Sequence, residues 1–143
     1  MKKLLYRFYP AFINVYTVWM LYLLFFANFR IEDKHIFEIR YIPFQTIYLY
    51  IFVWIKDSIM ESVKNIFGNI LLFIPYGFLG IMYPKLNQLK WFLFAFFIVI
   101  NIVEFSQYYF KRGFADIDDI ILNTTGAVIG FCIYKRFLFI KGK

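Results

Sequence analysis

Long apolar runs, separated by short charged segments, set the pattern of this 143-residue chain. A helix needs about 17 to 25 residues to cross the hydrocarbon core of a bilayer. The uncharged runs at 8–29 and 65–84 are long enough by themselves. Two others become long enough only by including charged residues: 91–110 includes Glu104, and 120–140 includes Lys135 and Arg136. The pattern therefore predicts four transmembrane helices, at about 9–29, 66–83, 90–110 and 118–139.

A fifth uncharged run, at 41–55, is too short to span a membrane. It contains Pro43 and Gln45, and the charged segment 56–64 follows it. Runs of this length are typical of interfacial or re-entrant segments, and positions 48–66 have the pattern of an aromatic-rich amphipathic helix in the headgroup plane. We therefore expect an all-α membrane protein with four transmembrane helices plus an interfacial or re-entrant amphipathic segment between helices 1 and 2.

Composition supports this class. Hydrophobic residues make up 62% of the chain, whereas soluble domains are about half apolar. We find no internal repeat or linker, so residues 1–143 are expected to form a single integral membrane domain. The basic N-terminus and the apolar run after it superficially resemble a signal peptide. That run is too long and lacks a small-residue cleavage site, so we expect it to remain as the first helix.

The net charge of +7 does not indicate nucleic-acid binding, because the basic residues lie singly or in pairs at the edges of apolar runs. With the N-terminus in the cytoplasm, nine of the 16 Lys and Arg residues lie on the inner side, at higher density than the seven outside. This asymmetry predicts that both termini are cytoplasmic. The inner residues are Lys2, Lys3, Arg7, Lys85, Lys90, Lys135, Arg136, Lys141 and Lys143.

Polar residues gather on one face of the third predicted helix. Asn101, Glu104, Gln107 and Lys111 are spaced by three, three and four residues, which places them on one side of a helix. Glu104 would lie about 20 Å across the hydrocarbon core from residue 90. Ionisable groups at such depth are expensive and indicate a functional site unless folding explains them.

The fourth predicted helix begins with three carboxylates. Asp116 is well placed to cap the helix, and Asp118 and Asp119 would occupy its first turn, where free N–H groups favour negative charge. Capping therefore accounts for these residues, although less completely for Asp119. Asp119 shares its helix face with Asn123, and Gly126 and Gly130 follow at the spacing that lets helices pack closely, so this face is expected to pack against another helix.

The second predicted helix has a similar polar face. Its members are Asn65, Gly68, Asn69, Leu72 and Tyr76. Asn69 is expected to bridge helices. Pro75 removes a backbone hydrogen bond in mid-helix, so we expect a kink whose free carbonyl is accommodated by neighbouring helices.

Three motifs, in order, resemble the VanZ-like family of bacterial membrane proteins. They are NILLFIPYGFLG at 69–80, EFSQ at 104–107 and RGFADIDDIILNTTGAVIG at 112–130, and RYIPFQTI at 40–47 is also similar. The resemblance covers residues 14 to 134. It implies a multi-pass protein of the bacterial plasma membrane, of a type associated with teicoplanin resistance in Gram-positive bacteria. The family's motif positions correspond here to Asn69, Pro75, Gly77, Glu104, Gln107, Arg112, Asp116, Asp119, Asn123 and Gly126.

We favour a binding function at the outer face of the membrane. Arg112 and Asn123 would bind the polar groups of an amphiphile or cell-envelope component, and the aromatic segment 44–54 would contact its acyl chains. The expected partners are membrane lipids and a lipid-linked envelope component or lipoglycopeptide, with no cofactor and no metal. The binding cluster comprises Asn69, Glu104, Gln107, Arg112, Asp116, Asp119 and Asn123, and the helix-packing residues are Pro75, Gly77, Gly126 and Gly130.

Two alternatives remain open. In the first, the protein is an enzyme that acts on a lipid phosphate or lipid-linked wall precursor. Glu104 and Asp119 are its catalytic candidates, Arg112 would hold an anionic headgroup, and Asp116 or Asp119 would bind a divalent cation such as Mg²⁺. In the second, the protein is a scaffold in which a buried ion pair between Glu104 and Arg112 fixes the helix register.

Two further residues bear on these choices. His35 lies in a polar loop, where we expect a solvated side chain, so histidine-dependent hydrolases are disfavoured. Cys132 lies in an apolar run and is expected to be a small buried hydrophobic residue.

Overall fold

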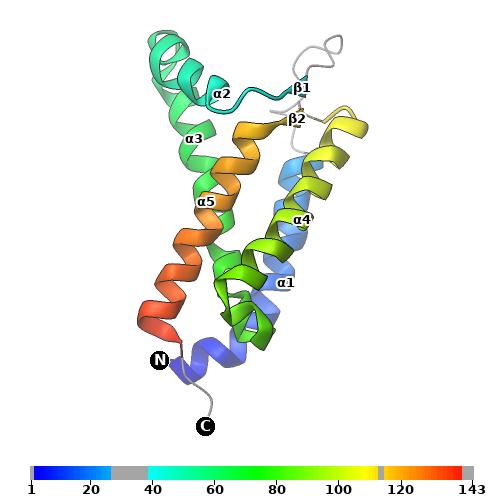
Figure 1. Ribbon diagram of the computed structural model, residues 1–143, viewed down its shortest axis with the longest axis vertical. Coiled ribbons are helices and arrows are strands. Elements are labelled where there is room, and N and C mark those ends of the chain that lie inside the picture. Colours follow the sequence, from blue (N-terminus) through cyan, green and yellow to red (C-terminus); the bar gives the residue numbers. More distant parts are fainter. Residues whose placement is uncertain (1, 27–38, 113–114, 140–143) are drawn as a thin grey trace.

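The computed structural model describes residues 2–26, 39–112 and 115–139. Long helices run side by side between two ends of an elongated bundle (Figure 1). They are α1 (Lys2–Phe26), α3 (Ile59–Phe73), α4 (Leu89–Tyr109) and α5 (Ile117–Ile133). A 3₁₀ segment, Ile74–Ile81, extends α3, a second one, Pro84–Asn87, leads into α4, and a π turn, Tyr134–Leu138, extends α5.

Within the described residues, four helical stretches are long and apolar enough to cross a membrane. They cover Lys3–Phe26, Ile59–Ile81, Leu89–Tyr109 and Ile117–Leu138. The all-α membrane fold predicted from the sequence is therefore confirmed. The last three residues of the first predicted span, 27–29, lie outside the described residues, as does His35.

The segment between the first two spans is helical but short. It consists of α2 (Gln45–Tyr48), a π turn (Leu49–Val53) and a 3₁₀ turn (Trp54–Lys56). Ser58 then adopts an extended conformation and accepts a hydrogen bond from the Glu61 N–H at 3.2 Å, which caps α3. The prediction of one helix over 48–66 is therefore wrong, because this cap divides it and places 59–66 in the second span.

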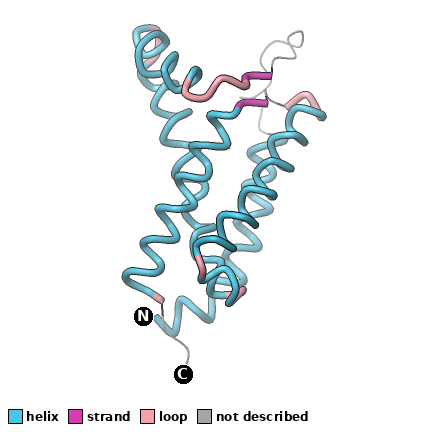
Figure 2. Tube along the Cα trace, in the orientation of Figure 1, coloured by secondary structure: helices cyan, strands magenta, loops and turns pink. Residues whose placement is uncertain are grey.

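Two short strands join distant parts of the chain at one end of the bundle. β1 (Ile39–Arg40) pairs in parallel with β2 (Ala115–Asp116), so that Arg40 lies opposite Asp116. Figure 2 shows the pair just before α2 and α5, at the end opposite the two termini. We call this the β end and the opposite one the terminus end. The pairing places the start of α5 beside the start of α2.

Three glycines allow α3 and α5 to approach closely. A Cβ atom added to Gly126 would collide with the backbone of Ile70, and one added to Gly130 would collide with that of Ile74. From the other side, Gly77 faces the backbone at Phe131. Such contacts exclude side chains at these positions, as in other close-packed membrane helices.

Pro75 changes the helix type in the second span. The α-helix ends at Phe73, and 3₁₀ geometry follows from Ile74, since proline lacks a backbone N–H and its ring clashes with the preceding turn. The hydroxyl of Tyr9 donates to the Pro75 carbonyl and that of Tyr16 to the Leu72 carbonyl, both at 2.8 Å. Side chains of α1 thus bind backbone groups on both sides of the break.

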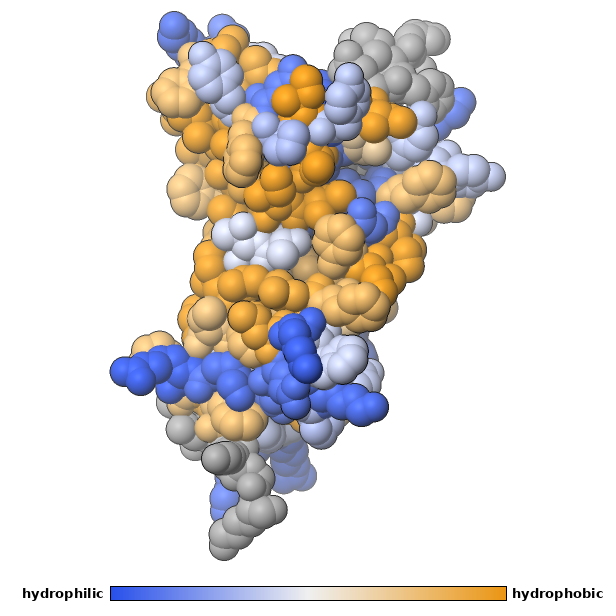
Figure 3. All heavy atoms as spheres, viewed as in Figure 1, coloured by the Kyte–Doolittle hydropathy of each residue, from blue (hydrophilic) through white to orange (hydrophobic). Residues whose placement is uncertain are grey.

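On the face seen in Figure 3, the middle of the bundle is mostly apolar, and hydrophilic residues gather toward its ends. Large hydrophobic side chains such as Leu71, Phe94 and Ile102 are exposed there, as expected for a surface that faces lipid. Cys132 is also exposed. Its predicted burial is wrong, because an apolar run does not distinguish a side chain that faces lipid from one that faces other helices.

The glycine contacts predict a position-specific cost of added methyl groups. We expect Gly126→Ala to lower the free energy of unfolding by about 1–3 kcal/mol, because the new Cβ would push α5 away from α3. Gly68→Ala is the matched control, since nothing lies within 4 Å of its Cβ position. Unfolding in mixed micelles would measure both, and equal stabilities of the two variants would contradict the close contact.

Candidate functional site

The first turn of α5 organises the β end. Asp116 precedes the helix in an extended conformation, and its Oδ1 accepts a hydrogen bond from the Asp118 N–H at 2.9 Å. The predicted helix cap is therefore confirmed. The second carboxylate oxygen, Oδ2, accepts a hydrogen bond from the Thr46 hydroxyl at 2.6 Å. Asp116 thus connects the start of α5 with α2, a role that its position in the sequence did not predict.

Asp118 makes a second connection to the same segment. Its carboxylate accepts hydrogen bonds from the backbone N–H groups of Phe44, Thr46 and Ile47, at 2.6, 2.7 and 3.0 Å. Only 1% of its surface is exposed. The first N–H groups of a helix have no partner within it, so Asp118 caps α2 from a distant part of the chain. The sequence assigned Asp118 only to the first turn of its own helix.

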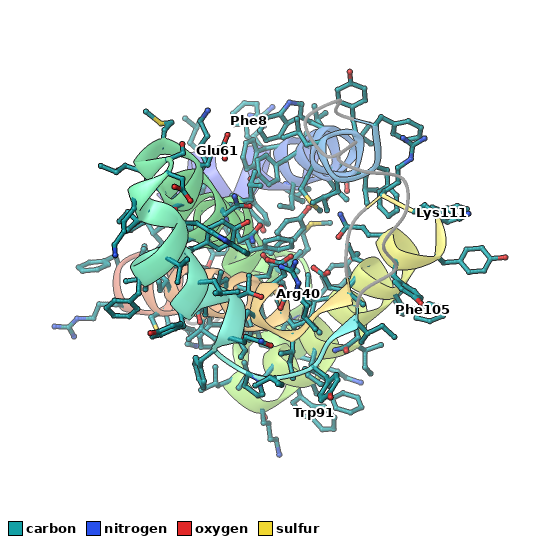
Figure 4. The ribbon with its side chains drawn as sticks, turned by 90° about the horizontal axis from the view of Figure 1, so that it is seen from above. Phe8, Arg40, Glu61, Trp91, Phe105 and Lys111 are labelled. Atoms are coloured by element: carbon teal, nitrogen blue, oxygen red, sulfur yellow. The ribbon has the colours of Figure 1, made fainter. Side chains whose placement is uncertain are left out.

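Arg40 lies beside these carboxylates and forms an ion pair with Asp116. Its Nη1 lies 3.9 Å from Asp116 Oδ2, and its guanidinium lies over the Trp54 ring, 5.9 Å from the centroid. Figure 4 shows Arg40 above the middle of the bundle, whereas Lys111 lies at the periphery. Arg40 was not among the predicted site residues, although it lies in the motif RYIPFQTI, shortly before the residues that Asp118 caps.

Arg112 lies just beyond the end of α4. Its backbone N–H donates to the Gln107 carbonyl at 2.8 Å, and its side chain is half-buried. Lys111, in the left-handed conformation with φ 57°, ends the preceding helix. Within the described part of the chain, the structure gives no ion pair between Arg112 and Glu104. The buried Glu104–Arg112 pair of the scaffold hypothesis stays a prediction.

Deeper in the bundle, polar side chains connect neighbouring helices in pairs. Asn123 Nδ2 on α5 donates to Glu104 Oε1 on α4 at 3.2 Å. Asn69 Nδ2 on α3 donates to Asp119 Oδ1 at 2.6 Å. Gln107 Nε2 donates to the Leu24 carbonyl of α1 at 3.1 Å. The predicted polar faces of the three later spans thus meet inside the bundle, and all of these residues except Asp119 are buried.

One buried acceptor in this cluster has no partner. Asn123 is 3% exposed, and its Oδ1 accepts no hydrogen bond from the described residues. Buried polar atoms are nearly always paired, so an unpaired one calls for a physical explanation. A bound group that donates a hydrogen bond would satisfy it.

The carboxylates act mainly as hydrogen-bond acceptors for the protein itself. Both oxygens of Asp116 and of Asp118 receive bonds from the protein. Among the described residues, no three His, Cys, Asp or Glu side chains lie close enough together to hold one metal ion. The carboxylates of Asp116 and Asp118 therefore lie inside the protein as hydrogen-bond acceptors, with Arg40 beside them.

Comparison with known proteins identifies the family. The sequence model of the VanZ/LLP1 family matches residues 12–140. The chain belongs to this family. A curated relative, Protein VanZ from Enterococcus faecium, is 32% identical over 75 residues, which are 51% of this chain and 45% of that protein. The match thus spans less than half of the relative's length. No solved structure matches.

The cap on α2 predicts local loosening when Asp118 is changed. In Asp118→Asn we expect hydrogen exchange at the Phe44, Thr46 and Ile47 amides to accelerate roughly 10- to 100-fold, since bonds to a charged acceptor are lost. Asp57→Asn is the matched control, because Asp57 is exposed and lies at the other end of the same segment. Unchanged exchange in Asp118→Asn would show that the carboxylate does not hold α2.

The bridge between α3 and α5 predicts a measurable coupling. A double-mutant cycle with Asn69→Ala and Asp119→Ala should give an interaction free energy of about 0.6–1.7 kcal/mol. Among the described residues, Asn65 bonds only to the Glu61 carbonyl of its own helix, so the cycle with Asn65→Ala should give no coupling to Asp119. Equal coupling in both cycles, measured by unfolding in detergent, would contradict a direct bridge.

Proposed function

We propose that this VanZ/LLP1-family protein binds an amphiphilic component of the cell envelope at its β end, on the outer face of the bacterial plasma membrane. We further propose that this binding contributes to teicoplanin resistance. The observation that carries the proposal is the buried polar cluster around Asn123, whose Oδ1 accepts no hydrogen bond from the described residues.

The charge distribution supports this orientation. Among the described residues, the charged side chains at the terminus end are all basic. The acidic residues lie toward the β end. Excess Lys and Arg favours the cytoplasmic side, so the β end would face outward. The described basic residues concerned are Lys3, Arg7, Lys85, Lys90, Lys135 and Arg136.

The polar lining favours a particular kind of headgroup. The cluster contains the carboxylates of Glu104, Asp116 and Asp119 with the guanidinium of Arg40, and Asn123 adds a neutral acceptor. Such a lining is complementary to groups that donate hydrogen bonds, such as hydroxyl, amide or ammonium. A lipoglycopeptide or lipid-linked sugar carries groups of this kind.

The aromatic segment beside the cluster suits the apolar part of the same ligand. Phe44, Tyr48 and Phe52 are each more than half exposed, and the rings of Tyr48 and Phe52 lie 4.9 Å apart. Trp54 connects this surface with the polar site through its contact with Arg40. Exposed aromatic side chains at the edge of a membrane contact both acyl chains and headgroups. Teicoplanin carries an acyl chain, so both parts of the surface would be used.

The proposal predicts a difference between two glycopeptides. Deleting the gene should lower the minimum inhibitory concentration of teicoplanin and leave that of vancomycin unchanged. Complementation with wild type should restore resistance, and complementation with Asn123→Leu should not. Asn101→Leu should restore it, because within the described part of the chain Asn101 donates only to the Phe97 carbonyl of its own helix. Equal shifts for both drugs, or none, would overturn the proposal, provided that immunoblots show equal amounts of each variant.

A further inference from the structure

A second surface lies at the terminus end, away from the polar cluster. An apolar groove of about 390 Å³ separates α1 from the 3₁₀ segment. Leu5, Phe8 and Phe12 line one side, and Ile74, Pro75 and Phe78 line the other. Tyr9 also lines the groove. Its hydroxyl donates a hydrogen bond to the Pro75 carbonyl, so only its ring faces the groove.

The groove belongs to two membrane spans, so it faces the hydrocarbon core. Its α1 residues follow one another at helical spacing on one face, and Phe8 and Phe12 remain about half exposed. The residues that line the groove present no polar atoms to it, and the medium around it is lipid. An acyl chain is therefore the occupant that fits its chemistry.

Cationic groups flank the groove toward the membrane surface. The Arg7 guanidinium lies over the Phe8 ring, 5.8 Å from its centroid. On the opposite side, Phe78 contacts Tyr134, whose ring packs against Phe139 beneath the Lys135 ammonium. Tyr6 and Tyr134 hydroxyls are 3.1 Å apart and hold the two sides together.

Charge complementarity specifies the headgroup. Every charged side chain that the structure describes at the terminus end is basic. Basic pockets between transmembrane helices at one membrane face bind anionic lipid headgroups. A zwitterionic lipid would place its own cation among these side chains, whereas an anionic phospholipid would not.

We infer that the groove binds one acyl chain of an anionic phospholipid, with the lipid phosphate held by Arg7. The site lies in the leaflet at the terminus end and is independent of the function proposed for the β end. Its occupant would fill the space that the Pro75 break leaves beside α1.

Native mass spectrometry of the full-length protein can test the site. The protein would be released from detergent after incubation with equal amounts of phosphatidylglycerol and phosphatidylcholine of matched chains. We expect preferential retention of one phosphatidylglycerol, and Arg7→Gln should reduce this preference about fivefold. Equal retention of both lipids by the wild-type protein would overturn the inference.

Two variants separate a specific site from general charge attraction. Lys90→Gln removes the same charge at the same end, and Lys90 also lies over an aromatic ring, that of Trp91, at 5.4 Å. Figure 4 shows Phe8 and Trp91 on opposite sides of the bundle. We expect Lys90→Gln to leave the preference unchanged and Leu5→Trp, which fills the groove, to abolish retention. Equal losses in the Arg7 and Lys90 variants, or full retention in folded Leu5→Trp, would refute the groove as the site.

Discussion

Lipid tails offer no hydrogen bonds, so each polar group that a chain carries into a membrane must find its partner inside the protein. In this bundle the requirement governs both the breaks in the helices and the contacts between them. Tyrosine hydroxyls of α1 reach carbonyls on both sides of Pro75. Asp118 receives the N–H groups that open α2. Elements that leave the α-helical pattern are thus fixed by side chains from other elements.

The same requirement explains why the polar residues converge at one end. Glycines bring the backbones of α3 and α5 into contact, and this contact places Asp119 within reach of Asn69. One turn further along α5, Asn123 meets Glu104 of α4. The helix that carries Gly126 and Gly130 thus also carries Asp118 and Asp119. Close packing and polarity depend on each other here, because buried carboxylates need neighbours at hydrogen-bonding distance.

Features with a local cause could be predicted from the sequence. The four spans follow from the length of the apolar runs, and the cap by Asp116 follows from its place before an apolar helix. The cap by Ser58 was equally local, since Ser58 and Glu61 form a capping-box pattern. The aromatic residues before Ser58 continue the amphipathic pattern, so the pattern alone does not show the break at Ser58.

Features that depend on distant residues could not be predicted in this way. Spacing along α5 places Asp118 in a first turn but does not reveal that Phe44 and Thr46 lie against it. For the same reason the ion pair of Arg40 with Asp116 was not predicted. The two-residue strands then bring Arg40 opposite Asp116, and strands this short leave no periodic signal.

The cap on α2 also has a consequence for the order of events during synthesis. The N–H groups of Phe44, Thr46 and Ile47 leave the ribosome 71 to 74 residues before the carboxylate that binds them. At about 5–20 residues per second, this separation is a delay on the order of seconds. During that interval, water must form hydrogen bonds with the N–H groups at the start of α2. The segment therefore stays at the membrane surface until α5 is inserted. Completion of the β end thus requires that α5 has been inserted.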